Sequence, residues 1–130
     1  MFNFIIIDDS RIDLMIALKT ISTSGIDFED LNDFASATDA LAHIKAADPA
    51  RHTIMLIDIQ MPVMNGFAFM DEFEKLSLEK RQHYTCMYLT SSLNDVDKLR
   101  AQKYTDIKAF VNKPITGEKL NQVLKSIHKI

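Results

Sequence analysis

The sequence of 130 residues contains one cysteine, no tryptophan, three glycines and three prolines. A single cysteine, Cys86, excludes a disulfide within the chain, and its apolar neighbours favour a buried structural thiol. Apolar runs all fall short of the roughly 18 residues that span a bilayer, and the first residues lack a positive region, so neither a membrane span nor a signal peptide is expected. Sparse cysteine is typical of a reducing compartment, and we therefore expect a cytoplasmic location.

Basic residues are also in the minority. Fifteen lysines and arginines are set against 18 aspartates and glutamates, which gives a formal net charge of −3. Binding to a nucleic-acid backbone needs clustered lysine and arginine, so direct nucleic-acid binding is not expected. The four histidines show no ligand spacing, and we expect them at the surface. The length predicts one domain over residues 1–130.

Five short apolar runs alternate with longer stretches of helical character. The runs at 4–7 and 54–57 are continuously apolar, which is typical of strands buried on both faces of a parallel sheet. Weaker or shorter runs lie at 28–34, 87–89 and 109–111. Strands that alternate with helices predict right-handed crossovers and a sheet covered on both sides, an α/β fold.

Amphipathic spacing predicts the helices between these runs. The clearest apolar stripe follows Thr116, which is a plausible N-cap, and comprises Leu120, Val123, Leu124 and Ile127. The charged stretch at 79–83 is expected to be a solvated loop before the fourth strand.

Polar side chains follow four of the five predicted strands. These are Asp8 and Asp9 after the first, Asp58 after the third, Thr90, Ser91 and Ser92 after the fourth, and Asn112 and Lys113 after the fifth. Ligands of open α/β sheets bind outside the carboxyl ends of the strands, so these groups should meet at one edge. Clustered carboxylates repel one another unless a cation lies among them, and oxygen ligands suit Mg²⁺. A carboxylate there could attack phosphorus, while a lysine and a hydroxyl stabilise the transferred group.

Each of these features also has a plainer interpretation when taken alone. The Asp8-Asp9-Ser10 stretch could be a turn with an N-cap, Asp58 could be a loop residue, and Lys113-Pro114 could be an exposed pair. Their shared position directly after apolar runs favours a single site.

Four stretches resemble the signature motifs of response-regulator receiver domains of two-component signalling. They are 7–10 (IDDS), 57–66 (IDIQMPVMNG), 89–92 (LTSS) and 110–114 (FVNKP). The resemblance covers essentially the whole chain and is closest to the stand-alone, single-domain type. It implies a flavodoxin-like, doubly wound sheet of five parallel strands in the order 2-1-3-4-5, flanked by five helices.

The resemblance also implies roles for individual residues. Asp58 would accept the phosphoryl group, and Mg²⁺ would be held by Asp58, Asp9, Asp8 (mainly through water) and the backbone carbonyl of Gln60. Lys113, in a cis peptide bond with Pro114, would pair with the phosphoryl group. The backbone around Ser91 would hold phosphoryl oxygens, Thr90 would be the switch hydroxyl, and Phe110 the switch aromatic, with plain core as the alternative for Phe110.

The implied partners are a sensor histidine kinase or a histidine phosphotransfer domain as phosphodonor. Residues 1–130 leave no room for an effector domain. If they are the whole gene product, the output is expected through an unknown downstream protein or a phosphorelay, with possible homodimerisation on phosphorylation, but a fragment of a longer protein would have the same sequence. The first helix carries two apolar stripes, of which Ile12, Met15 and Ile16 form one. This stripe is expected either to dock the phosphodonor or to belong to a wide packed face.

Two competing functions remain at this point. A phosphatase of the haloacid-dehalogenase type also uses an aspartyl nucleophile, but it needs an acid two residues later, where Gln60 stands, and its nucleophile follows the first strand. A receiver that is no longer phosphorylated usually lacks an acid or the lysine, and this chain keeps them all. We therefore expect a signalling domain that catalyses only its own phosphorylation and dephosphorylation.

Overall fold

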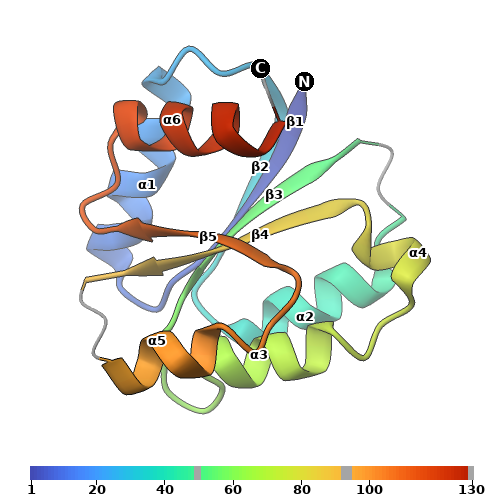
Figure 1. The fold of residues 1–130 in the computed structure, drawn as a ribbon. Helices are drawn as coiled ribbons and strands as arrows, with labels where there is room; N and C mark the ends of the chain where they lie inside the picture. Colours follow the sequence, from blue (N-terminus) through green and yellow to red (C-terminus); the bar gives the residue numbers. More distant parts are fainter. Residues whose placement is uncertain (49–50, 92–94, 129–130) are drawn as a thin grey trace.

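The computed structural model describes residues 1–48, 51–91 and 95–128 as one α/β unit (Figure 1). A single parallel sheet has the strand order β2-β1-β3-β4-β5, which confirms the predicted topology. The strands are β1 (Phe2–Ile7), β2 (Phe28–Phe34), β3 (Thr53–Asp58), β4 (Tyr84–Thr90) and β5 (Ile107–Asn112). The helices are α1 (Arg11–Thr23), α2 (Ala37–Ala46), α3 (Gly66–Phe73), α4 (Leu78–Arg81), α5 (Asp95–Ala101) and α6 (Gly117–His128).

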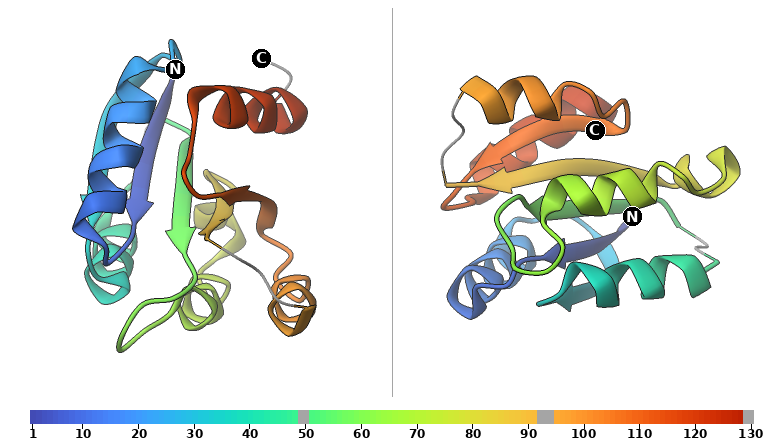
Figure 2. Two further views of the ribbon diagram at one scale, coloured as in Figure 1. Left: turned by 90° about the vertical axis from the view of Figure 1, so that its left-hand side faces the viewer. Right: turned by 90° about the horizontal axis from the view of Figure 1, so that it is seen from below.

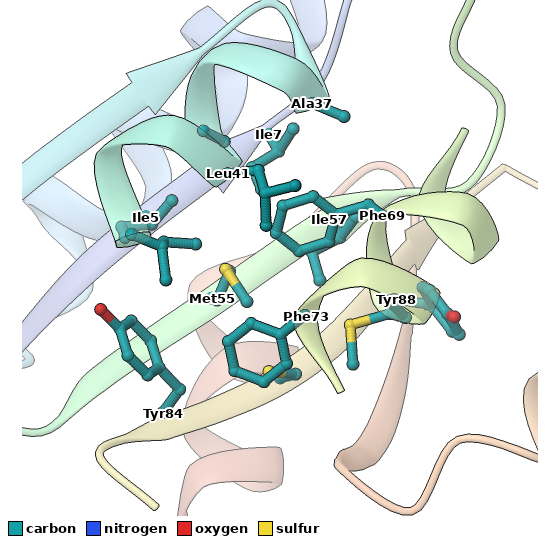
Figure 3. Packing of buried hydrophobic residues seen from close by; sticks show 14 of the residues in the cluster. Ile5, Ile7, Ala37, Leu41, Met55, Ile57, Phe69, Phe73, Tyr84 and Tyr88 are labelled. Carbon is teal, nitrogen blue, oxygen red and sulfur yellow. The ribbon is translucent and has the colours of Figure 1, made fainter. Parts of the chain in front are cut away.

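The helices cover both faces of the sheet (Figure 2). Buried residues of α1 and α6 pack with one set of strand side chains, and those of α2, α3 and α5 pack with the other set. Every residue of β3 is buried, as its continuously apolar sequence predicts for a central parallel strand. The side chains on the α2, α3 and α5 face of the sheet form what we call the second cluster. Figure 3 shows part of it, where Phe69 and Phe73 of α3 lie over Met55 and Ile57 of β3.

Cys86 lies within this second cluster. Its side chain is fully buried, and burial raises the pKa of the thiol well above its ordinary value. A thiol that stays protonated is a poor nucleophile, so the expectation of a structural cysteine is confirmed.

The expectation of five helices and of a loop at 79–83 was wrong, because the described residues include a sixth, one-turn helix, α4, over Leu78–Arg81. The reason is partly local, because the stretch consists of good helix formers and the N-cap Ser77 Oγ accepts a hydrogen bond of 3.2 Å from Lys80 N. A contact between distant parts of the chain adds to this. Lys80 Nζ donates hydrogen bonds of 2.8 Å to the carbonyl oxygens of Ile44 and Lys45. These oxygens belong to the last turn of α2, where carbonyls lack partners within the helix and a cation is favourable.

Three of the four histidines, His52, His83 and His128, are half-buried rather than at the surface as expected. The Nε2 atoms of His52 and His128 lie 2.6 Å and 3.0 Å from the hydroxyl oxygen of the buried Thr85. A hydroxyl has one proton and two lone pairs, so at most one imidazole accepts from Thr85 and at least one donates to it. This arrangement joins the end of α6 to the amino-terminal edge of the sheet.

Acid is expected to weaken this histidine arrangement. Burial lowers the pKa of both His52 and His128, and the charges of His128 and His83 lower that of His52 further. Because the folded-state pKa values lie below the unfolded value of about 6.5, the stabilisation is complete above that pH and is lost as the pH falls through the shifted values. Unfolding midpoints measured from pH 7.5 to 5 should fall less steeply in His128→Gln than in the wild type. Parallel curves would contradict this account.

Gly66 is the position where α3 comes closest to the sheet. A β-carbon there would lie 2.7 Å from the backbone oxygen of Asp58 and 2.9 Å from the α-carbon of Ile59. Neither backbone atom can move without displacing the end of β3, so only glycine fits. Asn65 begins the helix directly before it, with its side chain accepting a hydrogen bond of 2.8 Å from Ala68 N.

Gly66→Ala is therefore expected to lower the free energy of unfolding by roughly 1–3 kcal/mol, the usual cost of forcing atoms into filled space. The matched control is Gly117→Ala, because a β-carbon at Gly117 would have its nearest contact at 3.7 Å. That substitution should leave stability unchanged or raise it slightly, since alanine is less flexible in the unfolded chain. Urea unfolding of both variants measures the difference, and equal effects would argue against the close approach.

Within the described residues, no helix combines the length and apolar character needed to cross a membrane.

Candidate functional site

The candidate site lies at the carboxyl ends of the parallel strands (Figure 1). Asp8 and Asp9 follow β1, Asp58 is the last residue of β3, Thr90 the last of β4, and Lys113 follows β5. Parallel pairing places Asp58 opposite Leu89 and Thr90 opposite Asn112, so the strand ends are level with one another. The sheet register therefore brings together residues that are far apart in the sequence.

Three carboxylates form the centre of the site. One oxygen each of Asp8, Asp9 and Asp58 can be chosen so that all three lie within 4.8 Å of one another. Asp8 is fully buried and Asp58 is 7% exposed, whereas Asp9 is open to solvent. The cluster is therefore closed to solvent on the side of Asp8 and open to solvent on the side of Asp9.

Asp8 has one satisfied and one unsatisfied oxygen. Its Oδ1 accepts a hydrogen bond of 2.9 Å from Ser10 N. Its Oδ2 is buried, and Lys113 Nζ lies 2.7 Å away as an ion-pair contact, but this oxygen accepts no well-formed hydrogen bond. A buried carboxylate oxygen without a hydrogen bond is costly, and a hard cation among the three carboxylates would satisfy it. The donor set therefore fits Mg²⁺.

The protonation of Asp58 reflects the same crowding. Burial and then the charge of Asp8 raise the pKa of Asp58 to about 6, and Lys113 opposes this rise only in part. Like charges that share a pocket disfavour ionisation, and a bound cation would restore the ionised form.

Lys113 is the cation of the cluster. Its Nζ lies 2.7 Å from Asp8 Oδ2, 2.9 Å from Asp13 Oδ2 and 3.4 Å from Asp58 Oδ1. Burial alone would lower the pKa of this lysine, but its contacts with Asp8 and Asp13 and the charge of Asp58 raise it above the ordinary value. The ammonium is therefore charged at every physiological pH. The cis peptide bond between Lys113 and Pro114 confirms the conformation that the resemblance implies.

Asp13 belongs to this site, and sequence reasoning missed it. It is the third residue of α1 and follows Asp9 by four positions. That spacing was the available signal, but it indicates nothing about a lysine 100 positions later.

Thr90, Ser91 and Gln60 lie at or just after the carboxyl ends of β4 and β3. Thr90 is buried, and its backbone oxygen accepts a 2.8 Å hydrogen bond from Lys113 N, which ties the ends of β4 and β5 together. Ser91 and the side chain of Gln60 are exposed at the mouth of the site. Ser92 lies outside the described residues.

Phe110 lies on β5, away from the cluster. Its side chain is 40% exposed, and its ring stacks on Tyr88 with centroids 5.9 Å apart and an interplanar angle of 28°. Plain core, one of the two interpretations of this residue, does not fit such exposure. The Tyr88 hydroxyl beneath it is buried and has no hydrogen-bond partner among the described residues.

The two apolar stripes of α1 are separated by the fold. Leu14 and Ile21 are buried against the sheet, whereas Ile12, Met15 and Ile16 are 70%, 63% and 39% exposed. This second stripe, which we call the α1 apolar patch, starts one turn from the acidic cluster. The alternative of one wide packed face is therefore wrong.

Comparison with known proteins identifies the class to which this fold and site belong. The chain matches the family described as response regulator receiver domain over residues 4–125. Because this match covers most of its length, the chain belongs to the receiver-domain family of two-component signalling.

Individual relatives agree with this assignment. The chain is 30% identical over 124 residues to the sensor histidine kinase CheAY of Helicobacter pylori, covering 95% of this chain but 15% of that protein. It is 26% identical to the hybrid signal transduction histidine kinase L of Dictyostelium discoideum, with 96% and 7% covered. The chain therefore corresponds to a small part of these relatives.

Solved structures give the same result for whole chains. A response regulator receiver protein from Dyadobacter fermentans has a TM-score of 0.87 and 28% identity, with 97% of both chains covered. A two-component response regulator from Cytophaga hutchinsonii has a TM-score of 0.84 and 25% identity, with 100% of this chain and 98% of that chain covered.

Proposed function

We propose that residues 1–130 form one receiver domain in which Asp58 accepts a phosphoryl group with the help of Mg²⁺. The observation that carries this proposal is the meeting of three carboxylates around a buried, unsatisfied oxygen of Asp8, with Lys113 in reach of both Asp8 and Asp58. A sensor histidine kinase or a histidine phosphotransfer domain is the proposed donor.

The reaction is a transfer between two nucleophiles. A carboxylate oxygen of Asp58 attacks phosphorus, a P–O bond forms, and the P–N bond to the donor histidine breaks with its electron pair returning to the imidazole. Asp8, Asp9, Asp58 and the carbonyl of Gln60 would hold Mg²⁺, which when bound neutralises charge on the phosphoryl oxygens.

The protein's own residues position and stabilise the transferred group. The Lys113 ammonium, already directed at Asp58, would pair with a phosphoryl oxygen. The Thr90 hydroxyl and the backbone around Ser91 would donate hydrogen bonds to the others. Movement of Thr90 toward the phosphoryl group would free space near Tyr88, into which Phe110 would turn from its half-exposed position.

The output of this switch is proposed to be contact with a downstream protein or relay of the phosphoryl group. Homodimerisation on phosphorylation and a cytoplasmic location stay predictions.

The α1 apolar patch is the proposed docking surface for the phosphodonor. It lies beside the acidic cluster, and Val63 of the loop after β3 is also fully exposed. Apolar groups gathered at the mouth of a polar site are typical of a protein-binding surface.

Met15→Glu is therefore expected to slow phosphoryl transfer from a cognate histidine donor about ten-fold or more, because a charge would be buried in the complex. Labelling by acetyl phosphate, which needs no docking, should be unchanged. The exposed Leu78, far from the site on α4, provides the matched control Leu78→Glu. Equal transfer rates for Met15→Glu, Leu78→Glu and the wild type would reject the docking surface.

Incubation with acetyl phosphate and Mg²⁺ tests the proposed function itself. We expect a mass increase of one phosphoryl group per chain, loss of that increase when EDTA is added beforehand, and no continuing hydrolysis of p-nitrophenyl phosphate. Sustained turnover of the ester would indicate a phosphatase instead. Absence of any mass increase with a functional acetyl phosphate preparation would indicate a receiver domain that is not phosphorylated.

A further inference from the structure

Among the described side chains, Asp13 is the one acid in contact with Lys113 that lies outside the carboxylate cluster. Its Oδ2 accepts a hydrogen bond of 2.9 Å from Lys113 Nζ, and its side chain is 35% exposed. Within the part of the chain that the structure describes, the group of carboxylates close enough to hold a cation comprises Asp8, Asp9 and Asp58 but not Asp13. Its role therefore concerns the lysine rather than direct cation binding.

The ammonium of Lys113 lies within 3.4 Å of three carboxylates in the resting protein. It has three N–H donors, and three carboxylates lie around it, those of Asp8, Asp13 and Asp58. A phosphoryl group on Asp58 brings three further acceptor oxygens and close to two negative charges. For Lys113 to bind these oxygens, at least one resting contact must weaken.

The burial of the three carboxylates determines which of their contacts with Lys113 weakens on phosphorylation. Asp8 is fully buried, and its Oδ2 has no hydrogen bond to replace the lysine, so its contact is costly to break. Asp58 loses its negative charge when its oxygen bonds to phosphorus. Asp13 is partly solvated, and water can take the place of the lysine at little cost.

Asp13 also acts through its charge. Asp13 Oδ2 and Asp8 Oδ2 contact the same nitrogen, so Asp13 is a close neighbour of the cluster. A negative charge at this position attracts a divalent cation and repels an anionic phosphoryl group. Competition for Lys113 and direct repulsion thus act in the same direction on the phosphoryl group.

We propose that Asp13 is a positioning residue that holds Lys113 in the resting state and opposes the binding of an anionic group at Asp58. The proposal rests on the proposed function, because it concerns the same acceptor site. Asp13 thereby helps to determine the equilibrium between the resting and the phosphorylated states.

The experiment compares two variants that make the same chemical change at equivalent helix positions. Asp13 is the third residue of α1, and its N–H donates to the N-cap Ser10 Oγ at 3.3 Å. Asp39 is the third residue of α2, and its N–H donates to the N-cap Ser36 Oγ at 3.3 Å. Asp39→Asn therefore reproduces the loss of one charge from a first helical turn, at a residue for which the described part of the chain provides no ion pair with a lysine.

Affinity is measured by NMR titration of backbone amides, first with Mg²⁺ alone and then with fluoroberyllate at saturating Mg²⁺. For Asp13→Asn we expect about three-fold weaker binding of Mg²⁺ and about three-fold tighter binding of fluoroberyllate. Asp39→Asn should match the wild type in both titrations. A general structural defect would weaken both ligands, so the opposite directions are the specific signature.

The outcomes separate this inference from the proposed function. If wild type binds fluoroberyllate and Asp13→Asn binds it equally or more weakly, the role of Asp13 is wrong and the phosphoacceptor site stands. If the wild type itself does not respond to fluoroberyllate with Mg²⁺ present, both fail.

Discussion

Asp58→Asn is expected to abolish phosphoryl uptake and at the same time to stabilise the magnesium-free protein. The asparagine cannot form the acyl phosphate, so no mass increase should follow incubation with acetyl phosphate. Its neutral amide also relieves the repulsion from Asp8 that helps to raise the pKa of Asp58 to about 6. We expect a gain in unfolding free energy of about 2 kcal/mol at pH 7.5 in EDTA, after allowance for solvent screening.

The pH dependence of that gain has a definite sign. A carboxyl whose folded pKa is raised costs the folded state stability only while it is ionised. The gain from Asp58→Asn should therefore be present above about pH 6 and disappear below about pH 4, where the wild-type group is protonated in both states. Urea unfolding across this range measures it, with Asp39→Asn as the control. A destabilised Asp58→Asn protein at pH 7.5 would show that the carboxylates are not in conflict.

Lys113→Met is expected to have the largest effect on stability of any change at the site. The lysine side chain is 14% exposed, and its removal leaves the fully buried Asp8 without a counter-charge. Removal of one partner from a buried pair costs about 3 kcal/mol or more. We therefore expect a marked loss of unfolding free energy in magnesium-free buffer and a phosphorylation rate at least ten-fold lower.

Added Mg²⁺ should restore more stability to Lys113→Met than to the wild type, because the pocket without the lysine is more negative and binds the cation more tightly. Lys75→Met is the matched control, since Lys75 is 70% exposed and pairs with Glu72 at the surface. Denaturation midpoints with and without Mg²⁺ provide the readout. A Lys113→Met protein as stable as Lys75→Met would show that Lys113 does not compensate the negative charge of the buried Asp8 carboxylate.

The sequence was sufficient to predict the sheet and the residues at its carboxyl edge. The continuous apolar runs at 4–7 and 54–57 identify central parallel strands, and the residues that follow such strands must meet at one edge. Asp58 and Lys113 were predicted on this basis, and the structure brings them to 3.4 Å. Gly66 was recognised only as part of a motif, and its close approach to Asp58 becomes visible with the fold.

Contacts that depend on side-chain reach could not be predicted in the same way. Asp13 and Lys113 are 100 residues apart, and neither periodicity nor spacing indicates that the two side chains meet. The hydrogen bonds of His52 and His128 to Thr85 likewise join three distant segments. The helix α4 had a local signal in Ser77, an N-cap that is followed by four good helix formers. The contact of Lys80 with the end of α2 had no such signal.

The most direct test of the central claim is to locate the phosphoryl group. After incubation with acetyl phosphate and Mg²⁺, the protein is reduced with borohydride, digested and mapped by mass spectrometry. The account predicts that only the peptide containing Asp58 is modified, and only when Mg²⁺ is present. A phosphoryl group on another residue, or uptake at Asp58 that does not depend on Mg²⁺, would contradict it.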